Sequence, residues 1–161
     1  MGKRATKTLD NMYYKARMEA ASENDDFSSR EKTAELLGID RTRLARIELE
    51  TLFPYPEEVV QMAKVYNAPE LLNYFCAREC PIGKGNVHEI TIDDFDRLAL
   101  KVLGSLKDID QLRMSLIAIS EDGVIEAAEE KQFYSILDSL DKIATNATSL
   151  KIWAQKNIKV K

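Results

Sequence analysis

The sequence contains little cysteine and no long apolar run. Two cysteines, Cys76 and Cys80, are too few for the disulfide framework of a small secreted protein. No apolar stretch approaches the roughly 20 residues that cross a bilayer, and the polar start Met1-Gly2-Lys3-Arg4 lacks the apolar segment of a signal peptide. We therefore expect a cytoplasmic protein with no membrane partner.

Groups that carry catalysis or bind metals are also scarce. His88 is the only histidine, and with Cys76 and Cys80 it gives a spacing that matches no zinc finger. The segment 120–129 resembles part of a calcium loop, but Ala118 occupies the position where the first aspartate ligand is required. No glycine-rich phosphate loop and no G-x-S-x-G motif is present. We expect no enzyme activity, no metal and no cofactor.

Charge is distributed evenly except in one short stretch. The chain carries 23 Lys and Arg against 27 Asp and Glu, a net charge of −4, which does not favour nucleic-acid binding by the protein as a whole. Between residues 28 and 47 the balance reverses, because five basic side chains outnumber Glu31, Glu35 and Asp40. These five are Arg30, Lys32, Arg41, Arg43 and Arg46. A local patch of this kind can bind phosphate on an acidic protein.

Apolar periodicity and capping residues predict an all-α fold. Ser29 is a suitable N-cap for a helix over 30–37, Gly38 a suitable end for it, and Asp40 an N-cap for a second helix over 41–50. Two short helices joined by a tight glycine turn are the helix-turn-helix signature. Three further helices are predicted in this half, over 9–21, from Pro56 to Val65, and from Pro69 to just before Pro81.

The Pro- and Gly-rich stretch around residues 81–86 predicts a domain boundary. We expect a helix-turn-helix domain over 1–80, a linker over 81–90 and a helical hairpin over 91–161. Apolar residues recur at steps of three and four from Phe95 to Ile119, which predicts one amphipathic helix of roughly 28 residues, and again from Ile136 to Ala154. The two helices are expected to pair antiparallel.

Such a hairpin buries only one stripe of each helix. Phe133, Leu137 and Trp153 lie outside those stripes and need a further surface to cover them. A second copy of the chain is the simplest cover, so we expect a homodimer, with a protein partner at the hairpin as the alternative.

The run from Ser29 to Glu48 resembles the helix-turn-helix of the Cro/repressor-type family, also called the Xre family. The positions that carry the resemblance are Ala34, Gly38, Ile39, Leu44, Ile47 and Glu48, with Pro56 and Ala63 fitting the following helix. The wider sequence also resembles a group of uncharacterised clostridial regulators in this family that have a helical C-terminal extension. The resemblance implies a five-helix lambda-repressor-like domain and a transcriptional regulator.

By the family's docking geometry, the second helix of the motif enters the major groove and its first turns read base edges. The residues that this implies as base contacts are Arg41, Thr42, Arg43 and Arg46. Ser29, with the N–H groups at its helix start, and Arg30 are implied as phosphate contacts.

The sequence departs from the family pattern at three places. Thr33 replaces a core leucine, the acidic loop 23–26 lengthens a link, and Glu50 stands where a glycine usually ends the recognition helix. Glu50 lies either near DNA phosphate or in solvent, and the sequence does not distinguish the two.

Three functions are compatible with the sequence. The first is a repressor-like regulator that binds a palindromic DNA operator as a dimer. The second is a protein-interaction adaptor that keeps the fold but has lost DNA binding. The third is an antitoxin or mobile-element repressor whose hairpin clasps a partner protein.

Overall fold

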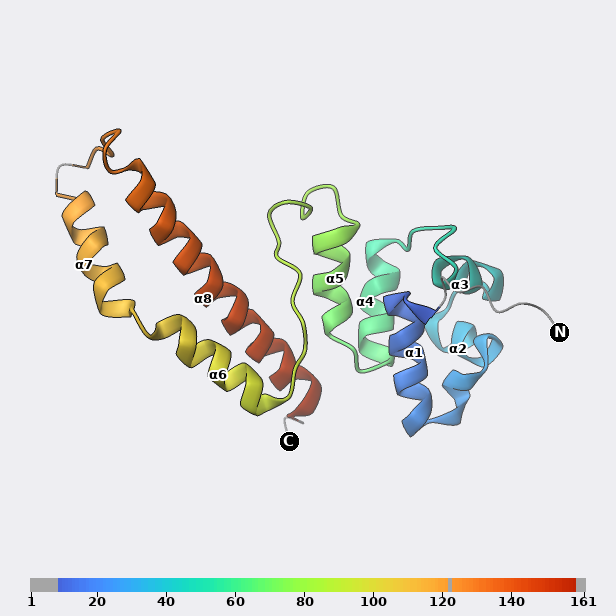
Figure 1. Cartoon of the computed structure of the whole chain (residues 1–161). Helices are drawn as coiled ribbons and strands as arrows, with labels where there is room; N and C mark the ends of the chain where they lie inside the picture. The colour runs from blue at the N-terminus through green and yellow to red at the C-terminus, as the bar shows by residue number, and fades with distance from the viewer. Residues whose placement is uncertain (1–8, 122, 159–161) are drawn as a thin grey trace. The chain divides into compact units, whose positions relative to one another are not determined.

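The computed structural model describes residues 9–121 and 123–158, and it divides into two compact units (Figure 1). Unit 1 comprises Met1–Glu89 and unit 2 comprises Ile90–Lys161. Helices form the regular structure of both units, and no strand occurs in the described ranges. The prediction of an all-α protein is therefore confirmed.

Unit 1 packs its helices around one hydrophobic core. Leu44, Met62 and Leu71 are completely buried there. Two edge-to-face ring pairs, Tyr13 with Tyr74 and Phe27 with Tyr66, lie in the same core. The elements are α1 (Met12–Glu23), the 3-10 helix η2 (Asp25–Ser28), α2 (Arg30–Leu37), α3 (Arg41–Glu48), α4 (Pro56–Val65) and α5 (Glu70–Arg78). The predicted bounds of α2 are confirmed, whereas α3 ends two residues before the predicted Glu50.

Three helices of unit 1 are each followed by the same type of turn. Gly38, Glu50 and Asn67 follow α2, α3 and α4 in the left-handed conformation, with φ values of 67°, 57° and 52°. The next residue in each case donates its N–H to a carbonyl five residues earlier, at 3.0, 2.9 and 2.8 Å. This is the Schellman arrangement, in which glycine is the least strained residue and asparagine is tolerated. Glutamate is the unusual choice of the three.

Unit 2 is a hairpin with a broken first arm. Its helices are α6 (Phe95–Leu106), α7 (Ile109–Ile119) and α8 (Glu130–Asn157). The prediction of one continuous helix over 95–119 is wrong, because the chain leaves helical geometry at Asp108 and starts α7 there. Asp108 is a poor residue inside a helix and occupies the N-cap position of α7, although its side chain makes no capping hydrogen bond there.

The arms of unit 2 are antiparallel, with α8 running back along α6 and α7 (Figure 1). Asn146 Nδ2 donates a 3.1 Å hydrogen bond to the carbonyl of Lys101, and the rings of Phe95 and Trp153 are 5.0 Å apart. The prediction that two helical arms pair antiparallel is thus confirmed. None of the helices in the described ranges is long and apolar enough to cross a membrane.

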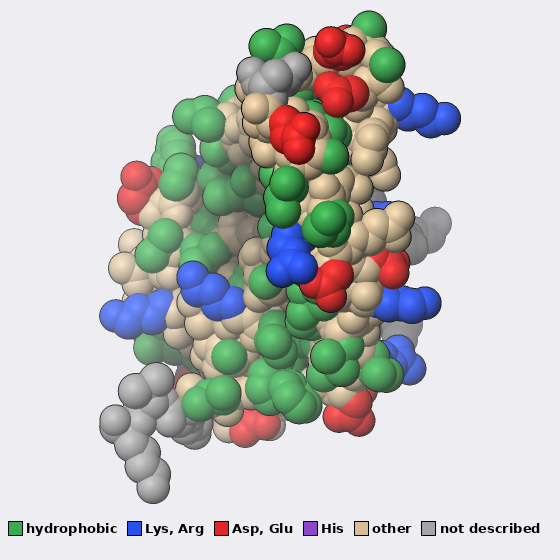
Figure 2. Space-filling view, turned by 90° about the vertical axis from the view of Figure 1, so that its left-hand side faces the viewer, with side chains coloured by type: hydrophobic (Ala, Val, Ile, Leu, Met, Phe, Trp, Pro, Cys, Tyr) green, Lys and Arg blue, Asp and Glu red, His purple; other side chains and the backbone are tan. Residues whose placement is uncertain are grey.

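Unit 2 buries few of its apolar side chains. Leu98, Ile119, Ile136 and Ile152 are its buried hydrophobic residues among those described. Figure 2 shows hydrophobic side chains lying in patches on a face of the protein, interspersed with charged ones. The large exposed set in unit 2 includes Leu100, Leu103, Met114, Ile117, Tyr134, Leu137 and Leu140. This is more exposed apolar surface than a hairpin that remains monomeric normally has.

Candidate nucleic-acid interface

The turn between α2 and α3 fixes the direction in which α3 leaves the core. The Asp40 carboxylate accepts hydrogen bonds from the N–H groups of Thr42 and Arg43, at 2.7 and 3.2 Å, and so caps α3. The N–H groups of Arg43 and Thr42 also hold the pKa of Asp40 below its ordinary value. Leu44 and Ile47 are then buried, which turns the opposite side of α3 toward solvent.

Three of the predicted base-contacting residues lie on that solvent side. Arg41, Thr42 and Arg46 are exposed. Within residues 9–121 and 123–158, neither Arg41 nor Arg46 forms an ion pair. Both guanidinium groups are therefore free to meet an anion without first leaving an internal carboxylate.

Arg43, the fourth predicted base contact, is held more firmly. Its Nε and Nη2 donate to the two carboxylate oxygens of Glu58, the second at 2.8 Å, and its guanidinium carbon lies 4.2 Å from the centre of the Tyr55 ring. The hydrogen bond and charge of Glu58 raise the pKa of Arg43 against the opposing effect of burial. Arg43 is thus positioned by the start of α4.

The two predicted phosphate contacts lie at the start of α2. Ser29 is the N-cap residue as predicted, but its side chain makes no capping hydrogen bond. Arg30 is one-third exposed, and its Nε donates a 2.6 Å hydrogen bond to Glu48. Both residues line a hollow of about 530 Å³ that Arg17 and Arg41 also line. The walls of this hollow bring three arginines near a helix N-terminus.

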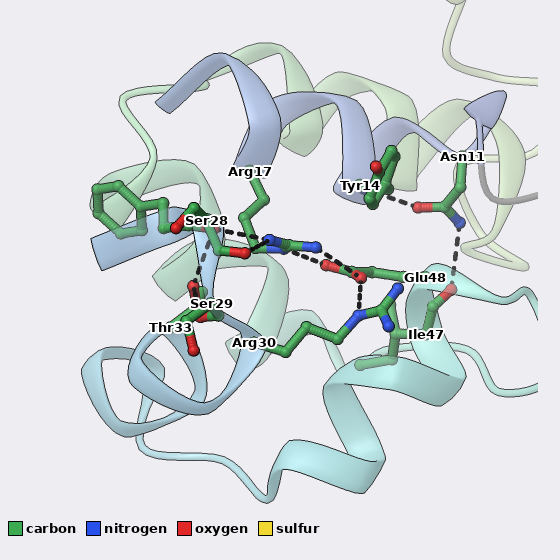
Figure 3. Close-up of polar contacts among 10 residues, drawn as sticks. Asn11, Tyr14, Arg17, Ser28, Ser29, Arg30, Thr33, Ile47 and Glu48 are labelled. Carbon is green, nitrogen blue, oxygen red and sulfur yellow. Dashed lines mark hydrogen bonds and ion pairs between the residues drawn. The ribbon is translucent and has the colours of Figure 1, made fainter. Parts of the chain in front are cut away.

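A buried ion cluster, which sequence reasoning missed, braces this arrangement (Figure 3). The Glu48 side chain is completely buried and binds Arg17 through both oxygens, at 2.5 and 3.1 Å, as well as Arg30. Arg17 Nη1 also donates to the carbonyl of Phe27 at 2.6 Å. The cluster therefore ties α1, the end of η2, α2 and α3 together.

One signal in the sequence points to this cluster. Arg17 falls on the inner face of α1, at helical spacing with the buried residues Tyr13, Ala16 and Ala20. A charged side chain on a buried face requires a partner of opposite charge. Glu48, on the inner face of α3 beside Leu44 and Ile47, is that partner.

The two cysteines form no disulfide and are half-buried. In the described part of the chain, no three metal-ligating side chains of the His, Cys, Asp or Glu type come together.

Comparison of this chain with protein-family models, curated proteins and solved structures finds no match. The geometry of α2 and α3 therefore provides the basis for a functional proposal.

Proposed function

We propose that this protein binds specific sequences in double-stranded DNA by placing α3 in the major groove, and that it acts as a repressor-like transcriptional regulator in the cytoplasm. The proposal includes a lambda-repressor-like fold for unit 1. The observation that carries it is the exposed side of α3 beside a tight glycine turn, where Arg41 and Arg46 form no ion pair with the described residues and Thr42 is exposed with its hydroxyl on Asp40. A helix-turn-helix presents its second helix to DNA in this way.

Arginine and threonine are suitable side chains for reading bases. An arginine donates two hydrogen bonds to O6 and N7 of guanine, and each such pair contributes about 1–3 kcal/mol of discrimination. Threonine contacts the thymine methyl group or a phosphate. We therefore expect half-sites that contain guanine, read by Arg41, Arg43 and Arg46.

The start of α2 supplies the phosphate contacts in this proposal. The first N–H groups of a helix are unsatisfied donors at its positive end, and they favour an anion. Because the Ser29 hydroxyl makes no capping bond, it is available to the same phosphate. Arg30 adds a charge there while its Nε remains on Glu48. Such contacts fix the register of the protein on the duplex without reading sequence.

The test is the salt dependence of DNA binding in two matched variants. Arg41→Ala removes an unpaired cation from the proposed interface, whereas Lys64→Ala removes one from the last turn of α4. The logarithm of affinity falls against the logarithm of salt by about 0.9 for each phosphate neutralised. Arg41→Ala should reduce that slope by about 1 per protomer if Arg41 meets phosphate, or lose one base preference if it meets guanine. If Arg41→Ala and Lys64→Ala give the same salt slope and the same base preference, the proposal is contradicted.

We propose further that unit 2 pairs two copies of the chain. Its exposed apolar side chains support this, because a second copy would cover them and would place two α3 helices on one operator. Half-sites are then expected about 34–36 Å apart, one turn of DNA.

Sedimentation of two variants of α8 tests the pairing. Leu140→Asp places a charge in the exposed apolar set and should give a monomer, whereas Thr148→Asp, at an exposed polar position, should remain a dimer. If Leu140→Asp stays dimeric, the interface lies elsewhere. If the unmodified chain is monomeric, its apolar face is instead available for a different protein, as in the adaptor and antitoxin alternatives.

A further inference from the structure

Arg43 differs from the other arginines of α3 because one edge of its guanidinium group is occupied. The Glu58 carboxylate binds Nε and one N–H of Nη2, and the Tyr55 ring lies against the guanidinium plane. A guanidinium has five N–H donors arranged as a planar fork. Glu58 therefore does not occupy the end of the fork formed by Nη1 and the outer N–H of Nη2, although the Tyr55 side chain also interacts with this guanidinium. That end presents two parallel N–H donors, which suit O6 and N7 of guanine.

Glu58 is itself held in place. Its Oε2 accepts a 2.7 Å hydrogen bond from the N–H of Tyr55, in the first turn of α4, which Pro56 begins. A carboxylate is stabilised at this positive end of a helix. Burial acts to raise the pKa of Glu58, but the hydrogen bonds from Arg43 and Tyr55 bring it below the ordinary value. The carboxylate is therefore charged at neutral pH.

We infer that Glu58 is a specificity-determining residue that fixes Arg43 for bidentate recognition of one guanine in each half-site. This inference rests on the proposed DNA binding and adds to it the identity of a base and of the residue that positions its reader. A long flexible side chain loses rotamer freedom when it binds, so holding it in advance favours the one base that fits. Tyr55 restricts the remaining freedom of the guanidinium plane.

The inference predicts two opposite effects of removing the Glu58 charge. An acidic side chain beside the interface repels phosphate, so its loss should strengthen binding to every sequence. The same change frees Arg43 to contact phosphates and other bases, so preference for its guanine should fall. A role confined to folding would lower stability and leave base preference unchanged.

Glu57 provides a matched control. It lies in the same first turn of α4 and carries the same charge, but it is exposed and makes no hydrogen bond or ion pair with Arg43. Glu57→Gln and Glu58→Gln thus remove one charge each from nearly the same place. In Glu58→Gln the side-chain amide can still accept the Tyr55 N–H, which preserves the start of α4.

The experiment measures affinities of the full chain for its selected operator and for operators substituted at each base pair. Arg43→Ala identifies the base pair that Arg43 reads, as the position where preference is lost. Glu58→Gln should lower the preference at that same base pair by about tenfold while strengthening binding to unrelated DNA. Glu57→Gln should strengthen unrelated binding without changing the preference.

The outcomes separate this inference from the proposed function. If the unmodified protein selects no sequence, the proposed function fails and the inference fails with it. If the protein selects an operator but Arg43→Ala affects no single base pair, or Glu58→Gln preserves the preference within about twofold, only the inference is overturned. If Glu57→Gln also lowers the base preference tenfold, the effect comes from the lost charge alone and the inference is overturned.

An NMR measurement on the free protein checks the positioning directly. The Arg43 Nε–H should give a distinct resonance in the unmodified chain because it is bonded to Glu58. That resonance should persist on operator binding and should disappear into the exchange-broadened arginine envelope in Glu58→Gln. Loss of the resonance on operator binding would show that the pair opens, and would overturn the inference.

Discussion

Replacing Arg17 by methionine tests how α3 is held in unit 1. The change leaves the Glu48 carboxylate, whose side chain is completely buried, without the partner that binds both of its oxygens. It also removes the donor to the Phe27 carbonyl. Breaking one side of a buried ion pair typically costs about 3–5 kcal/mol, and here only the partly exposed Arg30 would remain bonded to the buried Glu48 carboxylate.

This loss is large relative to the stability of the unit. A unit of 89 residues, Met1–Glu89, has an unfolding free energy on the order of 4–13 kcal/mol. Arg30→Met should cost much less, because Arg30 is 33% exposed and binds Glu48 through Nε alone. The double variant Arg17→Met/Glu48→Leu should recover most of the loss, because it removes the stranded charge together with its partner.

Urea unfolding of the full chain provides the measurement. Tyrosine emission follows mainly unit 1, which has five of the six tyrosines, while Trp153, the only tryptophan, reports on unit 2. With a slope of about 1.5 kcal/mol/M, the unit 1 midpoint should fall by about 2–3 M in Arg17→Met. A loss below about 1 kcal/mol, or a double variant as unstable as the sum of both single changes, would refute the reasoning.

Two other predictions concern carboxylates of unit 1. Glu50→Gly should stabilise the unit by about 1 kcal/mol, because glycine takes the left-handed conformation after α3 without strain. Glu35→Gly, inside α2, should instead destabilise the unit. Thermal unfolding measures both changes, and the opposite sign in either variant would contradict the prediction. Burial of Glu79 raises the pKa of that carboxyl, outweighing the hydrogen bond from Tyr13, so its folded form holds a proton more tightly than the unfolded chain. The stability that this proton contributes is fully present below the pKa of the unfolded chain, about 4.3. It is lost as pH rises through the higher pKa of the folded chain. Glu79→Gln should therefore gain stability relative to the unmodified chain across that rise, and a difference independent of pH from 4 to 7 would count against this assignment.

Local signals in the sequence predicted much of unit 1. Ser29, Gly38 and Asp40 mark the ends of α2 and α3 because capping depends on neighbouring residues alone. The family pattern has a glycine at the position of Glu50, and Glu50 takes the left-handed conformation that such a glycine would take. The exposed placement of Arg41, Thr42 and Arg46 also follows from the periodicity of α3.

Contacts between distant segments were not predicted. Arg17 and Glu48 are separated by 31 residues, and Arg43 and Glu58 by 15, so no spacing rule connects either pair. In unit 2, apolar periodicity continues through the break at Asp108, because α6 and α7 both face α8. Periodicity records which face is buried and does not record where the backbone bends.

The central claim is that the solvent face of α3 reads a DNA sequence. Its most direct test is selection of the full chain on a random duplex library at two salt concentrations, followed by sequencing of the retained DNA. The account predicts an enriched two-fold motif with guanine in each half-site, and binding that weakens steeply as salt rises. Retention of no DNA at low salt, or of DNA without any sequence preference, would contradict it.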